Sequence, residues 1–381
     1  MTHRERFLAT MQYSPSDRGI ITDFGFWDET LVIWHDQGLP EGINPTNYGP
    51  FFGVDPWSVD AGVNVGLAPC FPWILIEDQG DHEIVQDNEG VRIRRGKFMG
   101  SIPEHIAHLL IDRDSWRWHY RSRLNPATAA RLPDPESAHW KSIIDPNRTQ
   151  ATVVLGGSLY GWLRNWMGME NVSLAVYDDP AWFGEMVETI ADCIVGSLQR
   201  AIDQGLRPDA VAMWEDMCYN RGPLLSPAHF KEYMVPQYRR ITDLVRSVGC
   251  ETIWVDCDGN TDQLVPMWLD AGVNTMFPME VGTWHGEPVS MRAKFGRDLR
   301  MMGGFDKHLL AGDPRGITAE VERLAPLVEE GGFIPFPDHR VPPDVPLDHF
   351  VHYLLEARRV WGKNAPDLTP MQPTRSRFVA S

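Results

Sequence analysis

The chain has few cysteines, and none of them is spaced for disulfide or thiolate-metal chemistry. Its 381 residues hold five cysteines with no Cys-x-x-Cys pair, which argues against a disulfide framework and against a thiolate zinc site. No apolar run approaches the roughly 18 to 20 residues that a membrane helix needs. Residues 1–7 have no apolar character of the kind found in signal peptides. We therefore expect a cytoplasmic protein that has no membrane partner.

Basic patches and a dinucleotide motif are also missing. The 35 Lys and Arg against 52 Asp and Glu give a net charge of −17, with no basic stripe, so nucleic acid is excluded as a partner. No Gly-x-Gly-x-x-Gly follows an apolar run, which disfavours a dinucleotide fold. What the chain does have is tryptophan, 15 in all. These side chains fit either an aromatic-walled pocket or an ordinary core.

From residue 150 onward, short apolar runs alternate with longer amphipathic stretches. The runs predict strands, and the stretches between them predict helices. The expected strands are 152–155, 209–214, 252–255, 274–277, 299–302 and 333–335, and the expected helices are 180–204, 227–248, 261–271, 317–330 and 347–361. Such alternation is typical of a parallel sheet with right-handed crossovers. With residues 19–23 as one more strand, the pattern predicts an α/β protein with a (β/α)8 TIM barrel.

The stretch 25–145 fits this pattern less well. It is rich in Trp, Pro and Phe, and it contains a predicted hairpin of 83–86 with 91–94 around an Asp-Asn-Glu-Gly turn. We interpret 25–145 as an aromatic-rich insertion in one barrel domain that spans 1–363. Residues 364–381, which contain three prolines, are predicted to form a flexible tail.

Two carboxylates stand at the end of the strand predicted at 252–255. Because side chains at i and i+2 of a strand share a face, Asp256 and Asp258 should aim at one point, with Cys257 turned away. Two like charges at that distance are unfavourable unless a cation or a proton lies between them. The alternative is that such residues only cap the following helix.

Charged groups follow the neighbouring predicted strands as well. We expect four of them to be ligands of a divalent metal: Asp256, Asp258, Glu280 and His339. Carboxylate oxygens with a single imidazole suit zinc, manganese or iron, and zinc is favoured. Asp216 and Asp306 suit helix caps equally well.

The remaining candidate residues surround the same strand ends. Glu215 and Asp216 are predicted to contact the substrate or to act as general acid and base. The expected substrate-binding residues are Phe24, Phe26, Trp27, Trp214 and Trp254 as aromatic walls and Tyr160 and Arg164 as polar anchors.

Several motifs resemble one family. Asp256-x-Asp258-Gly-Asn-Thr, the Gly303-Gly304-x-Asp306 segment, the run Gly-Gly-Phe-Ile-Pro-Phe-Pro-Asp-His-Arg-Val-Pro-Pro at 331–343 and the opening Arg-Glu-Arg-Phe-Leu-Ala-Thr-Met are similar to the uroporphyrinogen decarboxylase superfamily. The resemblance covers most of the chain. It implies a (β/α) barrel and either porphyrinogen decarboxylation or corrinoid-linked methyl transfer.

The chain departs from each branch in an informative way. Where the decarboxylases carry an Arg-rich loop, residues 23–29 are aromatic and acidic, and acidic groups would repel a polycarboxylate. The methyltransferase branch, and the similar barrel of cobalamin-independent methionine synthase, hold zinc on His-x-Cys, Glu and Cys. The matching positions here are Asp256, Asp258, Glu280 and His339. The resemblance thus implies a site with hard ligands, suited to polarising an oxygen rather than a thiol.

The sequence therefore predicts a metal-dependent methyltransferase or O-demethylase that acts on a small methoxylated or methylated substrate. The methyl acceptor would be a separate corrinoid protein or a tetrahydrofolate-type cofactor, because the chain has no corrinoid-binding module of its own. A metal-dependent lyase, decarboxylase or hydrolase and a non-catalytic ligand-binding protein stay open as alternatives. Assembly as a homodimer is also left open.

Overall fold

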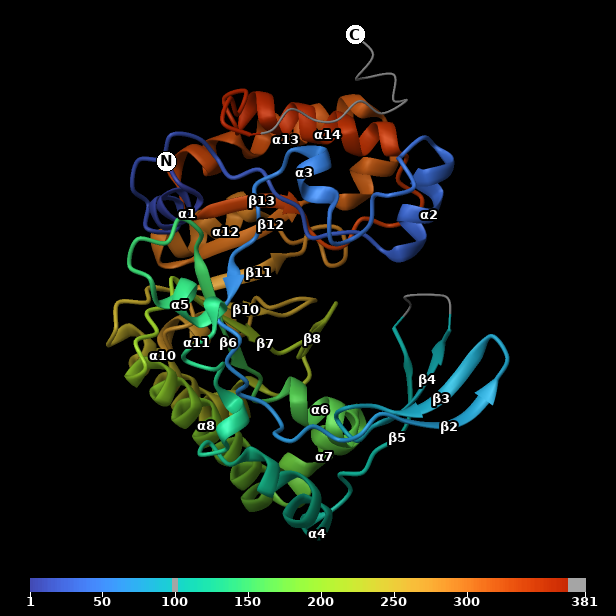
Figure 1. Cartoon of the computed structure of the whole chain (residues 1–381), viewed down its shortest axis with the longest axis vertical. Helices are drawn as coiled ribbons and strands as arrows, with labels where there is room; N and C mark the ends of the chain where they lie inside the picture. Colours follow the sequence, from blue (N-terminus) through green and yellow to red (C-terminus); the bar gives the residue numbers. More distant parts are fainter. Residues whose placement is uncertain (98–101, 369–381) are drawn as a thin grey trace. The chain divides into compact units, whose positions relative to one another are not determined.

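The computed structural model describes residues 1–97 and 102–368 (Figure 1). The chain forms two compact units. The first comprises Met1–Ser58, Thr149–Ala151 and Thr275–Ser381, and the second comprises Val59–Arg148 and Thr152–Asn274. The predicted insertion at 25–145 is thus not one block, because its first part belongs to one unit and its remainder to the other.

Four parallel strands form the centre of the second unit. They are β1 (Val59–Asp60), β6 (Thr152–Gly157), β7 (Ala210–Trp214) and β10 (Thr252–Asp256), and they pair in that order. Two long helices, α8 (Pro180–Asp203) and α10 (Val235–Arg246), pack against each other beside them (Figure 1). The strands expected at 152–155, 209–214 and 252–255 are therefore confirmed, with boundaries moved by two residues at most.

The second unit also carries an antiparallel sheet. Its strands are β2 (Ile74–Gln79), β3 (His82–Gln86), β4 (Arg92–Gly96) and β5 (Glu104–Ala107). The predicted hairpin is confirmed, because Gln86 pairs with Arg92 across the turn. Val85 of β3, Ile93 of β4 and Val91 between the two strands form a small buried apolar cluster. The remaining elements of this unit are α4 (Arg113–Ser115), α5 (Ala138–Ile144), α6 (Gly161–Met167), α7 (Met169–Asp178), β8 (Cys218–Tyr219), β9 (Gly222–Pro223), α9 (Pro227–His229) and α11 (Val265–Asp270).

Three parallel strands form the centre of the first unit: β11 (Thr275–Met279), β12 (Arg300–Phe305) and β13 (Phe333–Pro337). The helix α13 (Pro314–Glu330) packs on α14 (Leu347–Val360), and the unit also holds α1 (His3–Met11), α2 (Asp28–Asp36), α3 (Tyr48–Phe52) and α12 (Pro288–Phe295). The prediction of a strand at 19–23 is wrong, because no regular strand forms there. The segment runs extended without ladder pairing, and its continuation makes one parallel bridge, between Phe26 and Val341.

The described residues thus contain seven parallel strands, alternating with helices as an α/β protein requires. Closure into an eight-stranded barrel remains a prediction. Among the residues that the structure describes, no helix is both long and apolar enough to cross a bilayer.

The chain beyond residue 363 is partly held in place. Asp367 accepts hydrogen bonds from Arg18 and Arg6, at 2.7 and 2.8 Å, and Ala365 is buried. Residues 365 and 367 of the predicted tail thus contact the rest of the first unit. Residues 369–381 lie outside the described part of the chain.

Candidate active site

Strands β7 and β10 place the polar groups of the second unit. Their parallel register sets Asp256 beside Trp214, and the ladder continues past the strand end, where the Glu215 amide donates to the Asp256 carbonyl at 2.8 Å. The residues that follow each strand therefore meet at one edge of the sheet. This is the edge at which open α/β sheets bind their ligands.

Three carboxylates gather at this edge. Asp216, Asp256 and Asp258 are all half-buried, and each offers an oxygen within 4.8 Å of those of the other two. The expected convergence of Asp256 and Asp258 is thus confirmed, and Asp216 joins them. Three negative charges at this separation repel one another unless a cation or protons compensate them.

Asp216 reaches the cluster through an unusual backbone conformation. Its φ of 42° lies in the left-handed region, which a non-glycine residue adopts at a cost. Arg164 donates to the Asp216 carbonyl oxygen and also reaches its carboxylate at 3.4 Å. The Asp258 amide donates to Asp216 Oδ1, also at 3.4 Å. These contacts do not make Asp216 a helix cap. Its carboxylate instead faces Asp258, which follows strand β10.

Glu215 has a different environment from its neighbour. Its side chain is fully buried and accepts hydrogen bonds from Ser158 Oγ, from the Tyr238 hydroxyl at 2.6 Å, and from the amides of residues 159, 160 and 161. Burial raises the pKa of Glu215, while these donors oppose that shift. No face of the carboxylate is left for a substrate. The prediction that Glu215 contacts the substrate is corrected: it fixes the loop between β6 and α6.

The two predicted polar anchors also differ. Tyr160 is fully buried, and its amide is one of the donors to Glu215, so its position does not suit a substrate anchor. Arg164 is half-buried, and its guanidinium lies 5.2 Å from the centre of the Trp214 ring. Trp214 is half-buried, whereas Trp254 is only 7% exposed. Of the second unit's predicted aromatic walls, Trp214 is therefore the accessible one.

The first unit holds the other predicted site residues. Phe24 and Trp27 lie 5.5 and 5.9 Å from the His339 ring, between ring centres. The chain's first extended segment therefore lies against the loop after β13. Glu280 is buried at the end of β11 and accepts a hydrogen bond from Thr283 Oγ1 at 2.9 Å. Phe26 packs among core aromatics such as Trp34 and is 6% exposed, so it contributes to the core of the unit.

Two acids of the first unit were not among the predicted site residues. Asp338 is fully buried and accepts from the amides of Val281, Gly282 and Lys307 at 2.7 to 3.1 Å. It thereby joins the loops after β11, β12 and β13. In the sequence, Asp338 stands in the family-like run at 331–343, directly before His339.

Asp23 is the second of these acids. It is 1% exposed, and burial raises its pKa to about 6. Oδ1 accepts from the Gly25 amide and from the Tyr48 hydroxyl, while Oδ2 has no hydrogen-bond partner among the described residues. The sequence showed that residues 23–29 are acidic and aromatic, but it did not single out Asp23.

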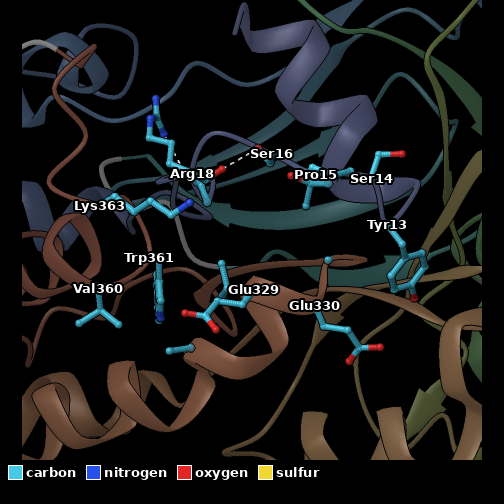
Figure 2. Close-up of a pocket in the computed structure, with 15 residues that line it drawn as sticks. Tyr13, Ser14, Pro15, Ser16, Arg18, Glu329, Glu330, Val360, Trp361 and Lys363 are labelled. Carbon is cyan, nitrogen blue, oxygen red and sulfur yellow. Dashed lines mark hydrogen bonds between the residues drawn. The ribbon is translucent and has the colours of Figure 1, made fainter.

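Each unit contains a cavity. Figure 2 shows one of about 470 Å³ in the first unit, where Tyr13, Glu330, Trp361 and Lys363 are among the residues that surround it. None of the predicted site residues lines it. The other, of about 400 Å³, lies in the second unit, and Trp214 forms part of its wall.

The strand order, the charged groups at the strand ends and the adjoining cavity define an α/β protein with an enzyme-like site. The chain belongs to the uroporphyrinogen decarboxylase (URO-D) family, whose pattern matches residues 163–361. This confirms the resemblance drawn from the sequence motifs.

Individual relatives are distant. A uroporphyrinogen decarboxylase of Sphingopyxis alaskensis is 22% identical over 201 residues, which are 48% of this chain and 51% of that protein. The chain thus spans about half the length of this curated relative. Among solved structures, a methyltransferase from Methanosarcina mazei is similar, with a TM-score of 0.56 and 15% identity over 94% of this chain and 98% of that one. A B12-independent methionine synthase from Shewanella sp. W3-18-1 gives a TM-score of 0.36 and 9% identity over 57% and 63% of the two chains.

Proposed function

We propose that this protein is a divalent-metal-dependent methyltransferase or O-demethylase that acts on a small methylated or methoxylated substrate. The observation that carries the proposal is the cluster of Asp216, Asp256 and Asp258 at the edge of the sheet, where Asp256 pairs with the half-buried Trp214. Membership of the URO-D family supports an enzyme. The similarity to the Methanosarcina mazei methyltransferase supports methyl transfer in particular.

The donor set fits a hard or borderline cation. All three groups offer carboxylate oxygens, which suit magnesium, calcium or manganese and also occur as zinc ligands. The nearby Cys257 is buried, and its thiol donates to the Asp258 carbonyl oxygen at 3.6 Å. The proposed ligands in this unit are therefore Asp216, Asp256 and Asp258. Glu280 and His339 of the first unit stay predicted ligands.

A bound divalent cation would supply Lewis acidity toward a substrate oxygen. The chain's own residues do the rest. Arg164 holds Asp216 against the mutual repulsion of the acids, and Trp214 offers an apolar face to a methyl-bearing group. The methyl acceptor, a corrinoid protein or a tetrahydrofolate-type cofactor, would bind from outside the chain.

Elemental analysis of the purified protein tests the metal. We expect about one divalent ion per chain, and we expect Asp258→Ala and Asp216→Ala to lose it along with activity, because each substitution removes a ligand. The matched control is Asp306→Asn, whose carboxylate caps the turn Lys307–Ala311 by accepting from the His308 amide. The control should keep its metal.

Two results would contradict the proposal. One is full activity in a metal-free protein after treatment with chelator. The other is turnover of substrate without any methyl acceptor, which would point instead to the lyase, decarboxylase or hydrolase alternative. A His339→Ala variant, measured in the same way, tests whether the imidazole is a ligand.

A further inference from the structure

The cavity of the second unit opens on one face of the parallel strands. Leu155 and Gly157 of β6 and Ala212 and Trp214 of β7 line it. Leu155 pairs with Ala212, and Trp214 follows Ala212 at a spacing of two residues, so these three lie on the same face. Gly157 borders the cavity after an irregularity in the pairing of the two strands. Leu155 is 47% exposed, although it lies in the middle of the sheet. This face is therefore open to a ligand in a volume of about 400 Å³.

A second indole, that of Trp162, is built into the wall. A Cβ on Gly157 would come within 2.7 Å of this ring, and one on Gly66 within 3.4 Å, so two glycines leave the space that the indole fills. Trp162 also stacks on the buried Trp166, at 5.8 Å between ring centres and 16° between planes. The ring is thus held in place while remaining half-exposed beside the cavity.

Asp60 is the one titratable group among the described residues that line this cavity. Its Oδ1 accepts from the Gly62 amide at 3.0 Å, while Oδ2 accepts no hydrogen bond from the described residues. The remaining lining residues are apolar, glycine or asparagine.

We propose that this cavity binds an organic cation with apolar substituents, such as a substituted ammonium ion. Indole faces attract cations through their quadrupole. The exposed carboxylate of Asp60, the one charged group among the described lining residues, also favours a positive charge. An anion would find no Lys, Arg or His among the lining residues. Arg164, which lies over Trp214, is already engaged with Asp216. The inference rests on the proposed function, in that it names the class of substrate.

A pair of ligands that share a shape and differ in charge tests the proposal on the unaltered protein. Choline carries a trimethylammonium group, and 3,3-dimethylbutan-1-ol carries a neutral tert-butyl group in its place. Titrations followed by calorimetry and by tryptophan fluorescence should show choline binding roughly 10-fold more tightly. Equal affinity for the two, or no binding of choline, would overturn the proposal.

Variants then locate the cation. Asp60→Asn keeps the shape of the side chain and removes its charge, so it should weaken choline binding several-fold and leave binding of the neutral alcohol unchanged. Trp162→Leu should weaken the binding of both choline and the neutral alcohol. The control is Asp203→Asn at the exposed end of α8, which removes the same charge away from the cavity. If Asp60→Asn and Asp203→Asn bind choline alike, the assignment of Asp60 is wrong.

These measurements are independent of catalysis, because choline binding is read without metal or methyl acceptor. If choline binds as expected while no methyl transfer is found, the proposed function fails and the cation site stands. If methyl transfer is found but choline and its neutral analogue bind alike, the function stands and the substrate class is wrong.

Discussion

Glu215 and Asp216 are adjacent in the sequence and yet have opposite environments. Glu215 points into the protein, where five donors surround its carboxylate, while Asp216 turns toward the acidic cluster at a φ of 42°. Buried carboxylates with satisfied oxygens fix structure, whereas half-exposed ones in a like-charged group are candidates for chemistry.

Glu215→Gln should therefore destabilise the protein without removing metal. The new amide group would direct a donor at existing donors, and we expect a loss of roughly 2 to 3 kcal/mol in the free energy of unfolding. Denaturant titration measures it, with Glu188→Gln on the exposed face of α8 as a control that should stay within about 0.5 kcal/mol. A variant that is as stable as wild type but inactive would restore the catalytic role predicted from the sequence.

Asp23 should make stability depend on pH in a defined window. Its pKa is raised by burial from 3.8 to about 6. The stabilising contribution of the protonated form is therefore complete below pH 3.8 and is lost as the pH rises through 6. The full difference is about 3 kcal/mol. Asp23→Asn lacks this titration, so the stability of wild type minus that of the variant should fall between pH 4 and pH 7 in denaturant titrations. A difference that stays constant with pH would contradict the raised pKa.

At the scale of elements, Asp338 ties three strand ends together in the first unit. Its two oxygens accept from amides in the loops after β11 and β12, and its own amide donates to the Phe305 carbonyl at 2.8 Å. Removing the carboxylate leaves three partly buried amide donors without their partner, which costs more than the loss of one exposed contact.

Asp338→Ala should thus lower stability by roughly 2 to 3 kcal/mol and loosen the loop at Val281 and Gly282. Hydrogen exchange should speed up at those two amides. The matched control is Asp344→Asn, six residues further along on an exposed loop, which should exchange as wild type does. Unchanged protection in the Asp338 variant would show that the loops hold without it.

At the scale of the whole molecule, one ion network joins early residues of the chain to Asp367 within the first unit. Arg18 bridges the buried Asp55 and the late residue Asp367, 349 positions away, and Arg6 contacts Asp367 as well. The hydrogen bond from Arg18 lowers the pKa of Asp367 to about 2.

Because the pKa of Asp367 is lowered in the folded protein, its contribution to the free energy of unfolding is present above pH 3.8 and is lost as the pH falls through 2. Because the Asp367 side chain is 45% exposed, screening limits the effect at neutral pH to about 1 kcal/mol. Asp367→Asn should lower the free energy of unfolding by that amount at pH 7. As a control, Asp298→Asn at an exposed position should leave the free energy of unfolding unchanged. If wild type and Asp367→Asn are equally stable, the ion network does not stabilise the segment around Asp367.

Local patterns in the sequence were sufficient for the elements and for part of the site. The apolar runs predicted six of the parallel strands, the Asp-Asn-Glu-Gly turn predicted the hairpin, and the spacing of Asp256 and Asp258 predicted their convergence. Each of these depends on the two-residue period of a strand or on turn chemistry. Both the strand period and the turn chemistry are set by residues close together in the sequence.

Tertiary packing decided the rest, because burial depends on contacts between distant parts of the chain. Phe26 and Tyr160 look in the sequence like pocket residues, and both are buried. The cavity needs Asp60, Trp162 and Trp214 to meet from three separate strands or helices, which no local spacing encodes. The sequence by itself therefore determined which residues stand at strand ends, and only the folded chain decided which of them face a ligand and which hold the fold.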